Sequence, residues 1–211
     1  MQRIANEQDL AQALKELGNR QAAFIELVEL VGIPALRGAE PGYRGLIRIV
    51  VDQMISLKAA QAIWNRMEEN LGPLEPENLI HRRESTLRKA GLSGGKIRAI
   101  QAITKAVRDG SLDLEALGSL DNDAVMAKLT ALPGVGPWTA EIYLLFCLGR
   151  ADIWPAGDVA LQHAVHHALR LSARPDAGQM RQLAEAWRPF RGAAALILWN
   201  YYRHLRGIPR P

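Results

Sequence analysis

The chain has 211 residues, 48% of them hydrophobic, and its 26 lysines and arginines against 22 aspartates and glutamates give a formal net charge of +4. This length and composition exclude a mainly disordered protein and suit one large hydrophobic core or two small ones. The basic balance favours a polyanionic partner, although similar charge is also met in proteins that bind no nucleic acid.

The single cysteine, Cys147, limits the disulfide and metal chemistry of the chain. It cannot form an intramolecular disulfide or a four-cysteine zinc or iron–sulfur site, and its apolar surroundings predict a buried structural thiol in a reducing compartment. The amino-terminal stretch is charged and amphipathic, and no apolar run approaches the length of a membrane span. We therefore expect a soluble, cytoplasmic protein.

Helical periodicity runs along nearly the whole chain without convincing two-residue alternation, so the predicted fold class is all-α. Short segments of Gly, Pro and Asp separate the predicted helices, and the Gly- and Pro-rich segment 32–45 predicts a crossing between two subdomains. The predicted helices cover residues 6–17, 20–31, 43–54, 56–70, 76–90, 95–108, 121–130, 137–148, 159–171, 177–187 and 190–204.

Basic residues gather in the middle of the chain, in the stretch "HRRESTLRKAGLSGGKIR" at 81–98. A surface that binds a polyanion would carry such a cluster, and so would an ordinary solvated helix face. The residues alone leave both interpretations open.

The stretch "LPGVGPWTA" at 132–140 predicts a tight hairpin between two helices. Gly134 and Gly136 allow turn conformations and a close approach to another surface, and Pro137 suits the first position of a helix. Backbone N–H groups of such a turn can bind a phosphate whatever the base sequence. An ordinary interhelical turn is the alternative that this motif alone does not exclude.

One acid, Asp158, stands between Gly157 and an amphipathic helical run. An aspartate in this position is commonly a helix N-cap, and a fixed carboxylate can also stabilise positive charge that develops on a substrate. One residue can do both. The run that follows carries His163, His166 and His167, but no third ligand stands at a zinc spacing, which favours a solvent-facing or DNA-facing surface over a metal site.

Together, the hairpin and the acid resemble the helix-hairpin-helix DNA glycosylase superfamily, in its alkylated-base branch of the 3-methyladenine DNA glycosylase II type. "LPGVGPWTA" is similar to the hairpin of that family, and "DIWPAGDVALQ" to the loop that carries its catalytic aspartate, with twenty residues from Trp138 to Asp158. The resemblance covers roughly residues 20–205 and includes "VDQMISLKAAQAIWNRM" at 51–67, "AGLSGGKIRAIQAI" at 90–103 and "AWRPFRGAAALILW" at 186–199.

The resemblance implies two helical subdomains with DNA in a basic cleft between them. Residues 1–45 and 141–211 would form one subdomain from both termini, and 46–140 would form a helical barrel that carries the hairpin at 130–140. The partner would be double-stranded DNA containing a damaged base, bound by a monomer.

The resemblance also implies roles for individual residues. Asp158 would be the catalytic acid, Trp138 and Trp199 would line the base pocket, and Met54, with Gln53 beside it, would enter the duplex in place of an extruded base. Hairpin residues matching the family's DNA contacts are Gly134, Val135, Gly136 and Thr139. For Met54 and for an isolated tryptophan, burial in a core is the alternative, and we assign Trp64, Trp154 and Trp187 to the core.

The family hairpin binds a monovalent cation, Na⁺ or K⁺, through main-chain carbonyl oxygens, and the matching residues here are Thr130, Leu132 and Val135. Ligation by carbonyl groups leaves no side-chain signature, so this site rests on the resemblance alone. No other cofactor is expected.

Four departures from the family refine the expectation. The segment before residue 40 is too short for the additional amino-terminal β-containing domain of longer relatives, which indicates the compact form. Trp138 stands where strand-cleaving relatives have a lysine, and one cysteine cannot hold an iron–sulfur cluster, so we expect no lyase activity. Ile142 replaces a tyrosine of some relatives, which leaves the base preference open. Asp152 resembles a structural acid of the family and is assigned no chemistry.

The sequence therefore predicts a monofunctional DNA glycosylase that hydrolyses the N-glycosidic bond of alkylated purines after flipping the base out of the duplex. The sequence leaves two alternatives open. One is a glycosylase for deaminated or mispaired bases, and the other is a non-enzymatic helix-hairpin-helix module that only binds DNA.

Overall fold

The computed structural model describes residues 2–36 and 38–208, and it confirms the all-α prediction. The described residues form helices and turns without a β-strand, apart from one isolated bridge between Arg3 and Arg150. Contacts divide the chain into two compact units, which we call unit 1 (residues 1–38 and 149–211) and unit 2 (residues 39–148). None of the helices in the described ranges has the length and apolar character needed to cross a membrane.

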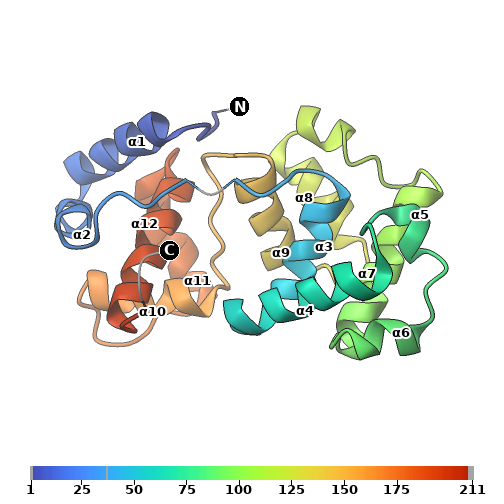
Figure 1. Cartoon of the computed structure of the whole chain (residues 1–211). Helices are drawn as coiled ribbons and strands as arrows, with labels where there is room; N and C mark the ends of the chain where they lie inside the picture. The colour runs from blue at the N-terminus through green and yellow to red at the C-terminus, as the bar shows by residue number, and fades with distance from the viewer. Residues whose placement is uncertain (1, 37, 209–211) are drawn as a thin grey trace. The chain divides into compact units, whose positions relative to one another are not determined.

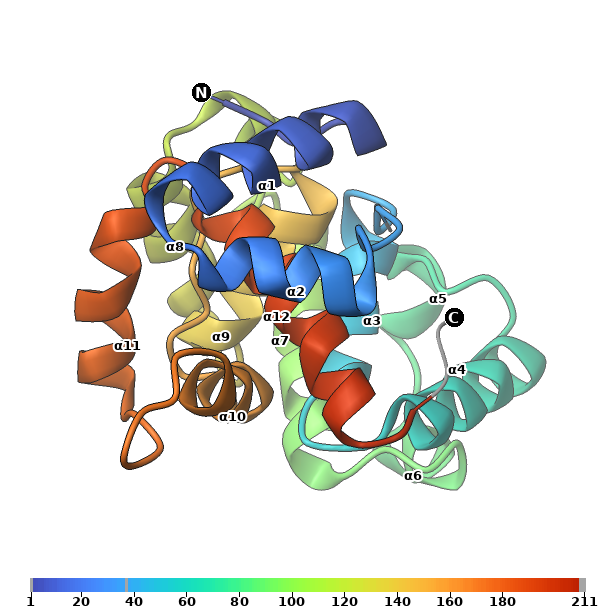
Figure 2. The same cartoon turned by 90° about the vertical axis from the view of Figure 1, so that its left-hand side faces the viewer.

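Unit 1 combines helices from both ends of the chain around one core. The last helix, α12, packs against α10, α2 and α1, and its stretch from Gly192 to Leu198 is buried (Figures 1 and 2). The elements of unit 1 are α1 Glu7–Arg20, α2 Ala23–Val31, α10 Val159–Ala168, α11 Ala177–Ala184, the 3-10 turn η3 Glu185–Trp187 and α12 Arg191–Leu205.

An aromatic cluster fills the core of unit 1. The ring of Trp187 meets those of Phe24 and Trp154 edge-on, at centroid distances of 5.3 and 5.0 Å. Both indole N–H groups are satisfied, because Trp187 donates to Gln21 Oε1 at 2.8 Å and Trp154 donates to the Met180 carbonyl at 3.0 Å. Trp154 and Trp187 are thus core residues, as predicted from the usual burial of isolated tryptophans.

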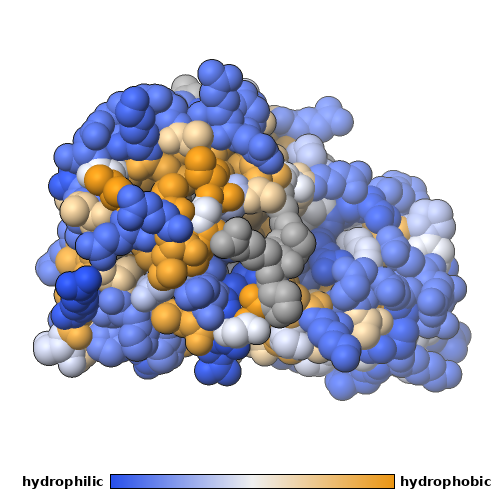
Figure 3. Space-filling model, turned by 60° about the vertical axis from the view of Figure 1, so that its left-hand side comes forward, coloured by the Kyte–Doolittle hydropathy of each residue, from blue (hydrophilic) through white to orange (hydrophobic). Residues whose placement is uncertain are grey.

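Apolar side chains also reach the surface of unit 1. Ile25 and Leu30 on α2, and Ile33 just after it, are each about half exposed. Figure 3 shows orange apolar surface among blue polar side chains on the side of the protein turned towards the viewer.

Unit 2 is built around α3, which contacts α4, α7 and α9 (Figure 1). Helix α7 buries Ile97, Ile100 and Ile103 at the three-residue spacing of one helix face. The elements of unit 2 are α3 Tyr43–Asp52, α4 Leu57–Leu71, α5 Pro76–Leu79, α6 Glu84–Lys89, α7 Gly94–Arg108, the 3-10 turn η1 Ala116–Ser119, α8 Asn122–Thr130, α9 Pro137–Ile142 and the π-helical turn η2 Tyr143–Cys147.

The helix predicted over 76–90 is wrong as one element, because the structure has α5 and α6 with a break between them. Arg82 lies in this break and folds back, donating to the carbonyl oxygens of Leu71 at 3.0 Å and Asn78 at 3.1 Å. Arg83 then takes an extended conformation before α6 begins. These bonds favour the break over a continuous helix.

The unit boundaries differ from the predicted ones and lie after residues 38 and 148 rather than 45 and 140. Two hydrogen bonds explain the shift. The Ala39 N–H donates to the Phe146 carbonyl at 3.1 Å, and the Gly42 N–H donates to the Tyr143 hydroxyl at 3.0 Å. The segment before α3 and the turn η2 therefore belong together in unit 2.

Candidate active site

The loop that precedes α10 begins with a fixed acid, Asp152. Its carboxylate accepts two hydrogen bonds from Arg191, at 2.7 and 2.9 Å, and one from Arg188 at 3.0 Å. Beside it, the Ala151 carbonyl accepts the Gly192 N–H at 2.7 Å. Two-point binding of an arginine by a carboxylate holds both groups in one geometry. The start of the loop is therefore fastened to the first turn of α12.

The end of the same loop is Asp158, the N-cap of α10. Its Oδ1 accepts the Leu161 N–H at 2.9 Å and the indole N–H of Trp199 at 3.2 Å. Trp199 lies about two helical turns beyond Arg191 on α12. Because both ends of the loop are tied to one helix, the carboxylate has a defined place before any ligand binds.

The N-cap role of Asp158 is therefore real, and it is compatible with chemistry. The side chain is partly exposed, and the helix N-terminus behind it favours negative charge. The bond from Trp199 is the contact that the sequence did not reveal, because the two residues are distant in the chain. This arrangement suits a carboxylate that must face a developing cation without reorganising.

The predicted hairpin lies in unit 2, between α8 and α9, and its two glycines differ. Gly134 has φ +81°, and a Cβ added there would lie 2.6 Å from the Cβ of Ala99 on α7. Gly136 has φ −88° and has open space where a Cβ would be. The side chain of Val135, between them, is buried. Gly134 is thus required by the fold, whereas Gly136 is free to serve a surface contact.

A side-chain amide connects the hairpin to the end of α3. Gln53 Nε2 donates to the Thr139 hydroxyl at 2.7 Å and to the Gly134 carbonyl at 3.4 Å. Thr139 itself is only 2% exposed. Its side chain therefore holds Gln53 and does not face the surface, so the predicted contact of Thr139 with DNA stays a prediction for its backbone alone.

Directly after Gln53, Met54 projects from the turn between α3 and α4. It has a left-handed backbone with φ +56°, and it is 98% exposed. A large apolar side chain that is neither buried nor in a relaxed conformation is unusual. The core alternative for Met54 is excluded by this exposure.

The two tryptophans predicted for a base pocket are both partly exposed. Trp138 is the second residue of α9 in unit 2, and Trp199 lies on α12 in unit 1. Ile142, at the end of α9, is buried, so it offers no ring at the surface. Within unit 1 the structure brings Trp199 to Asp158, and within unit 2 it brings Gln53 to the hairpin.

The basic stretch 81–98 is not one continuous cationic face. Arg88 is paired with Glu84 at 2.8 Å, and Arg82 is bonded to backbone carbonyls. Lys96 is only 9% exposed and donates its Nζ to the Val51 carbonyl at 2.7 Å. No sequence signal separates Lys96 from its exposed basic neighbours.

The histidines of α10 form a partly exposed group. Arg174 Nη1 lies 3.0 Å from His163 Nε2, and since an arginine can only donate, this ring nitrogen is the acceptor. Burial and the positive charge of Arg174 both lower the pKa of His163. Over the described ranges, no three His, Cys, Asp or Glu side chains are grouped so that they could hold a metal ion.

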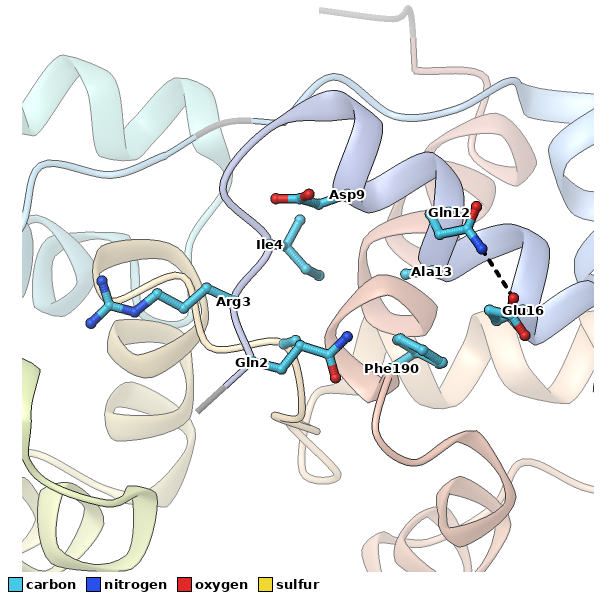
Figure 4. Close-up of a pocket in the computed structure, with 9 residues that line it drawn as sticks. Gln2, Arg3, Ile4, Asp9, Gln12, Ala13, Glu16 and Phe190 are labelled. Carbon is cyan, nitrogen blue, oxygen red and sulfur yellow. Dashed lines mark hydrogen bonds between the residues drawn. The ribbon is translucent and has the colours of Figure 1, made fainter.

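A pocket of about 430 Å³ lies in unit 1, between the amino-terminal segment, α1 and the turn before α12 (Figure 4). None of the residues predicted for the active site lines it, and one of its amides, Gln12, already donates to Glu16. Its lining residues are Gln2, Arg3, Ile4, Asp9, Gln12, Ala13, Glu16, Ala151 and Phe190.

Comparison with known proteins gives concordant findings from a family model, a related sequence and solved structures. The family model described as HhH-GPD superfamily base excision DNA repair protein matches residues 47–189, which include the hairpin and Asp158. The DNA-3-methyladenine glycosylase 1 of Schizosaccharomyces pombe is 34% identical over 182 residues, covering 82% of this chain and 79% of that protein.

Solved structures of DNA glycosylases also resemble this chain. The 3-methyladenine DNA glycosylase of Schizosaccharomyces pombe in complex with abasic DNA superposes with a TM-score of 0.83 and 32% identity, over 89% of this chain and 95% of that one. The DNA-3-methyladenine glycosidase of Bacillus halodurans superposes with a TM-score of 0.78 and 31% identity, over 94% and 92% of the two chains.

Proposed function

The chain belongs to the HhH-GPD superfamily of base excision DNA repair proteins, and we propose that it is a monofunctional DNA glycosylase that removes alkylated purines from double-stranded DNA. The observation that carries this proposal is Asp158, a carboxylate held by the first turn of α10 and by Trp199 at the place where the family resemblance expects the catalytic acid. A module that only binds DNA would not need this arrangement.

The role proposed for Asp158 is to stabilise positive charge electrostatically. As the bond between base and sugar breaks, positive charge develops on the deoxyribose, and water attacks C1′ while the base leaves. A carboxylate with a fixed position stabilises that charge at no further cost of reorganisation. An alkylated purine is cationic and a good leaving group, so aromatic faces such as Trp138 and Trp199 suit it better than a strong general acid does.

Access to the base requires that the nucleotide leave the stack, and Met54 is our candidate for the wedge that takes its place. Its nearly complete exposure and left-handed backbone project a flexible apolar side chain from the turn after α3. Such a side chain can fill the gap between stacked bases.

We assign the hairpin to the phosphate backbone of DNA. Gly136 is exposed and is the N-cap of α9, and the first backbone N–H groups of a helix have no partner within it, so they can bind a phosphate. The carbonyl oxygens of Thr130, Leu132 and Val135 are neutral ligands of the kind that Na⁺ and K⁺ bind. The Leu132 carbonyl already accepts the Val135 N–H at 3.1 Å and keeps a second lone pair. A cation there would add positive charge towards a phosphate. We further propose that the protein acts as a monomer in the cytoplasm.

The direct test uses duplexes that each carry one lesion: an alkylated purine, a deaminated base or a mispaired base. We expect release of the alkylated purine as free base, and strand breaks only after alkali treatment of the abasic product. Preferred release of a deaminated or mispaired base would shift the substrate class. Binding without release from any duplex would leave a DNA-binding module.

The absence of a lysine at Trp138 leads to a second expectation. A strand-cleaving enzyme forms a Schiff base between an amine and the sugar, which borohydride reduces to a stable covalent complex. Incubation of lesion DNA with this protein and borohydride should trap no such complex. A control reaction with a known lyase shows that trapping works, and efficient trapping of the present protein would contradict the monofunctional assignment.

The bond from Trp199 to Asp158 predicts a role beyond an aromatic face. Trp199→Phe keeps a ring but removes the N–H donor, and a hydrogen bond to a charged group contributes about 1.5–3 kcal/mol. We expect single-turnover excision to slow by about tenfold or more, and a melting curve should show that the variant is still folded at the assay temperature. If the rate of Trp199→Phe equals that of the unmodified protein, the indole does not orient the carboxylate.

A further inference from the structure

The turn that carries Met54 begins at a helix end whose carbonyl groups need partners. The last carbonyls of α3 have no partner within the helix. One of them, that of Val51, accepts the ammonium of Lys96 at 2.7 Å. Lys96 comes from the first turn of α7, where Ser93 is the N-cap. A lysine from another helix therefore fixes the backbone only three residues before Met54.

The ammonium of Lys96 sits in an unusual environment. Burial lowers its pKa, the opposing influence being the negative charge of Asp52 at the end of α3. Burial in turn raises the pKa of Asp52, against the influence of Arg48, which donates to that carboxylate at 3.0 Å. A buried charge is costly unless hydrogen bonds and opposite charge compensate it. The C-terminus of α3, with its partial negative charge, supplies part of this compensation.

The same face of α7 supports the hairpin. Ala99 follows Lys96 by three residues and therefore lies on the same side of the helix, and it is the residue against which Gly134 packs. Gln53 closes the arrangement, because its amide joins the turn after α3 to Gly134 and Thr139. The end of α3 and the hairpin are thus both held on one stretch of α7.

Met54 needs such support. A left-handed conformation costs a residue with a side chain about 1–2 kcal/mol, and it persists only where its neighbours hold it. The exposed Met54 side chain has no packing of its own to compensate this cost. The conformation is therefore maintained from the flanking backbone, and Lys96 and Gln53 are the side chains that hold that backbone.

We propose that Lys96 is a positioning residue for base extrusion, which holds the Met54 turn in its projecting conformation through the Val51 carbonyl. This inference rests on the proposed function, since it requires Met54 to act as the wedge. Lys96 does not touch DNA in this proposal. It acts by presenting the wedge in register with the hairpin before DNA is bound.

The test compares two substrates with the same alkylated purine, one in a fully paired duplex and one in an unpaired bulge. Extrusion of an unpaired base is less costly, so a wedge matters less there. Lys96→Met keeps the unbranched apolar body of the side chain, ending one atom short of the ammonium position, and removes the donor. We expect single-turnover excision from the paired duplex to fall by about tenfold, and excision from the bulge by less than about threefold.

A double-mutant cycle separates positioning from general stability. If Lys96 acts through Met54, the variant Lys96→Met with Met54→Ala should excise the paired lesion as slowly as Met54→Ala alone, within about twofold. Equal losses on both substrates, or additive losses in the cycle, would show that Lys96 has only a structural role. Unchanged excision from both substrates would also overturn the inference.

Failure of the proposed function would look different. In that case the unmodified protein would release no alkylated purine, or Met54→Ala would leave the ratio between paired and bulged substrates unchanged. If Lys96→Met does not fold, as judged by its melting curve, Lys96→Gln takes its place with the same expected selectivity. Its amide ends one atom short of the ammonium position, so it loses the bond to Val51 without burying a charge.

Discussion

Asp158→Asn is expected to lower single-turnover excision of an alkylated purine by about a hundredfold or more. The amide oxygen of asparagine can still accept the Leu161 N–H and the Trp199 indole N–H, both of which bind Oδ1 in the structure. Asparagine also caps helices about as well as aspartate, so the free energy of unfolding should change by less than about 1 kcal/mol. What the substitution removes is the negative charge that we propose faces the sugar.

The protein contains its own control for this experiment. Asp176 is the N-cap of α11 and accepts the Gln179 N–H at 2.8 Å, so Asp176→Asn makes the same chemical change at another cap. We expect Asp176→Asn to excise at the normal rate. Both variants should keep their affinity for abasic DNA and their melting temperature. Near-normal excision by well-folded Asp158→Asn would limit Asp158 to its capping role.

A second large effect is expected at the hairpin, where Gly136→Asp should weaken binding to damaged and undamaged duplex alike by at least about tenfold at low salt. Gly136 is the N-cap of α9, with φ −88° and open space for a side chain. Aspartate is well suited to this position, so the fold should be kept or slightly stabilised. Its carboxylate would occupy the place proposed for a DNA phosphate and repel it.

Gly136→Asn is the matched control, because asparagine caps the helix in the same way without a charge. It should bind DNA more tightly than Gly136→Asp, and the difference should narrow as salt is raised, since the Debye length falls from about 10 Å at 0.1 M to about 3 Å at 1 M. Equal affinities for the two variants would mean that the hairpin does not meet a phosphate. Gly134 is unsuitable for this test, because any side chain there would collide with Ala99.

Local signals in the sequence were sufficient for much of the fold. The apolar periodicity after Asp158 predicted both the helix and its N-cap, and Gly134 and Gly136 predicted a turn between two helices. These local signals could not show which distant residue forms a hydrogen bond with each polar side chain. The indole that binds Asp158 comes from α12, and the carbonyl that binds Lys96 comes from α3. Such contacts follow from packing between elements distant in the chain.

The two glycines of the hairpin, Gly134 and Gly136, also have different roles that the sequence does not distinguish. Their spacing predicted a turn, yet only the packing of Gly134 against Ala99 separates a glycine that the fold requires from one that it does not. Likewise, Gln53 and Thr139 matched family positions for DNA contact, and the structure shows that they bind each other. The exposed, left-handed Met54 follows from how α3 ends, which no pattern of residue types describes.

The fastening of the Asp158 loop by α12 has a consequence for biosynthesis. A ribosome releases the whole of unit 2, with its hairpin and Met54, before it translates Arg191 and Trp199. Domains commonly begin to fold in the order in which they leave the ribosome. A nascent chain can therefore have the hairpin and Met54, which we propose contact DNA, while Asp158 still lacks the helix that orients it. The capacity to cut a base from DNA is, on this account, the last property that the growing chain acquires.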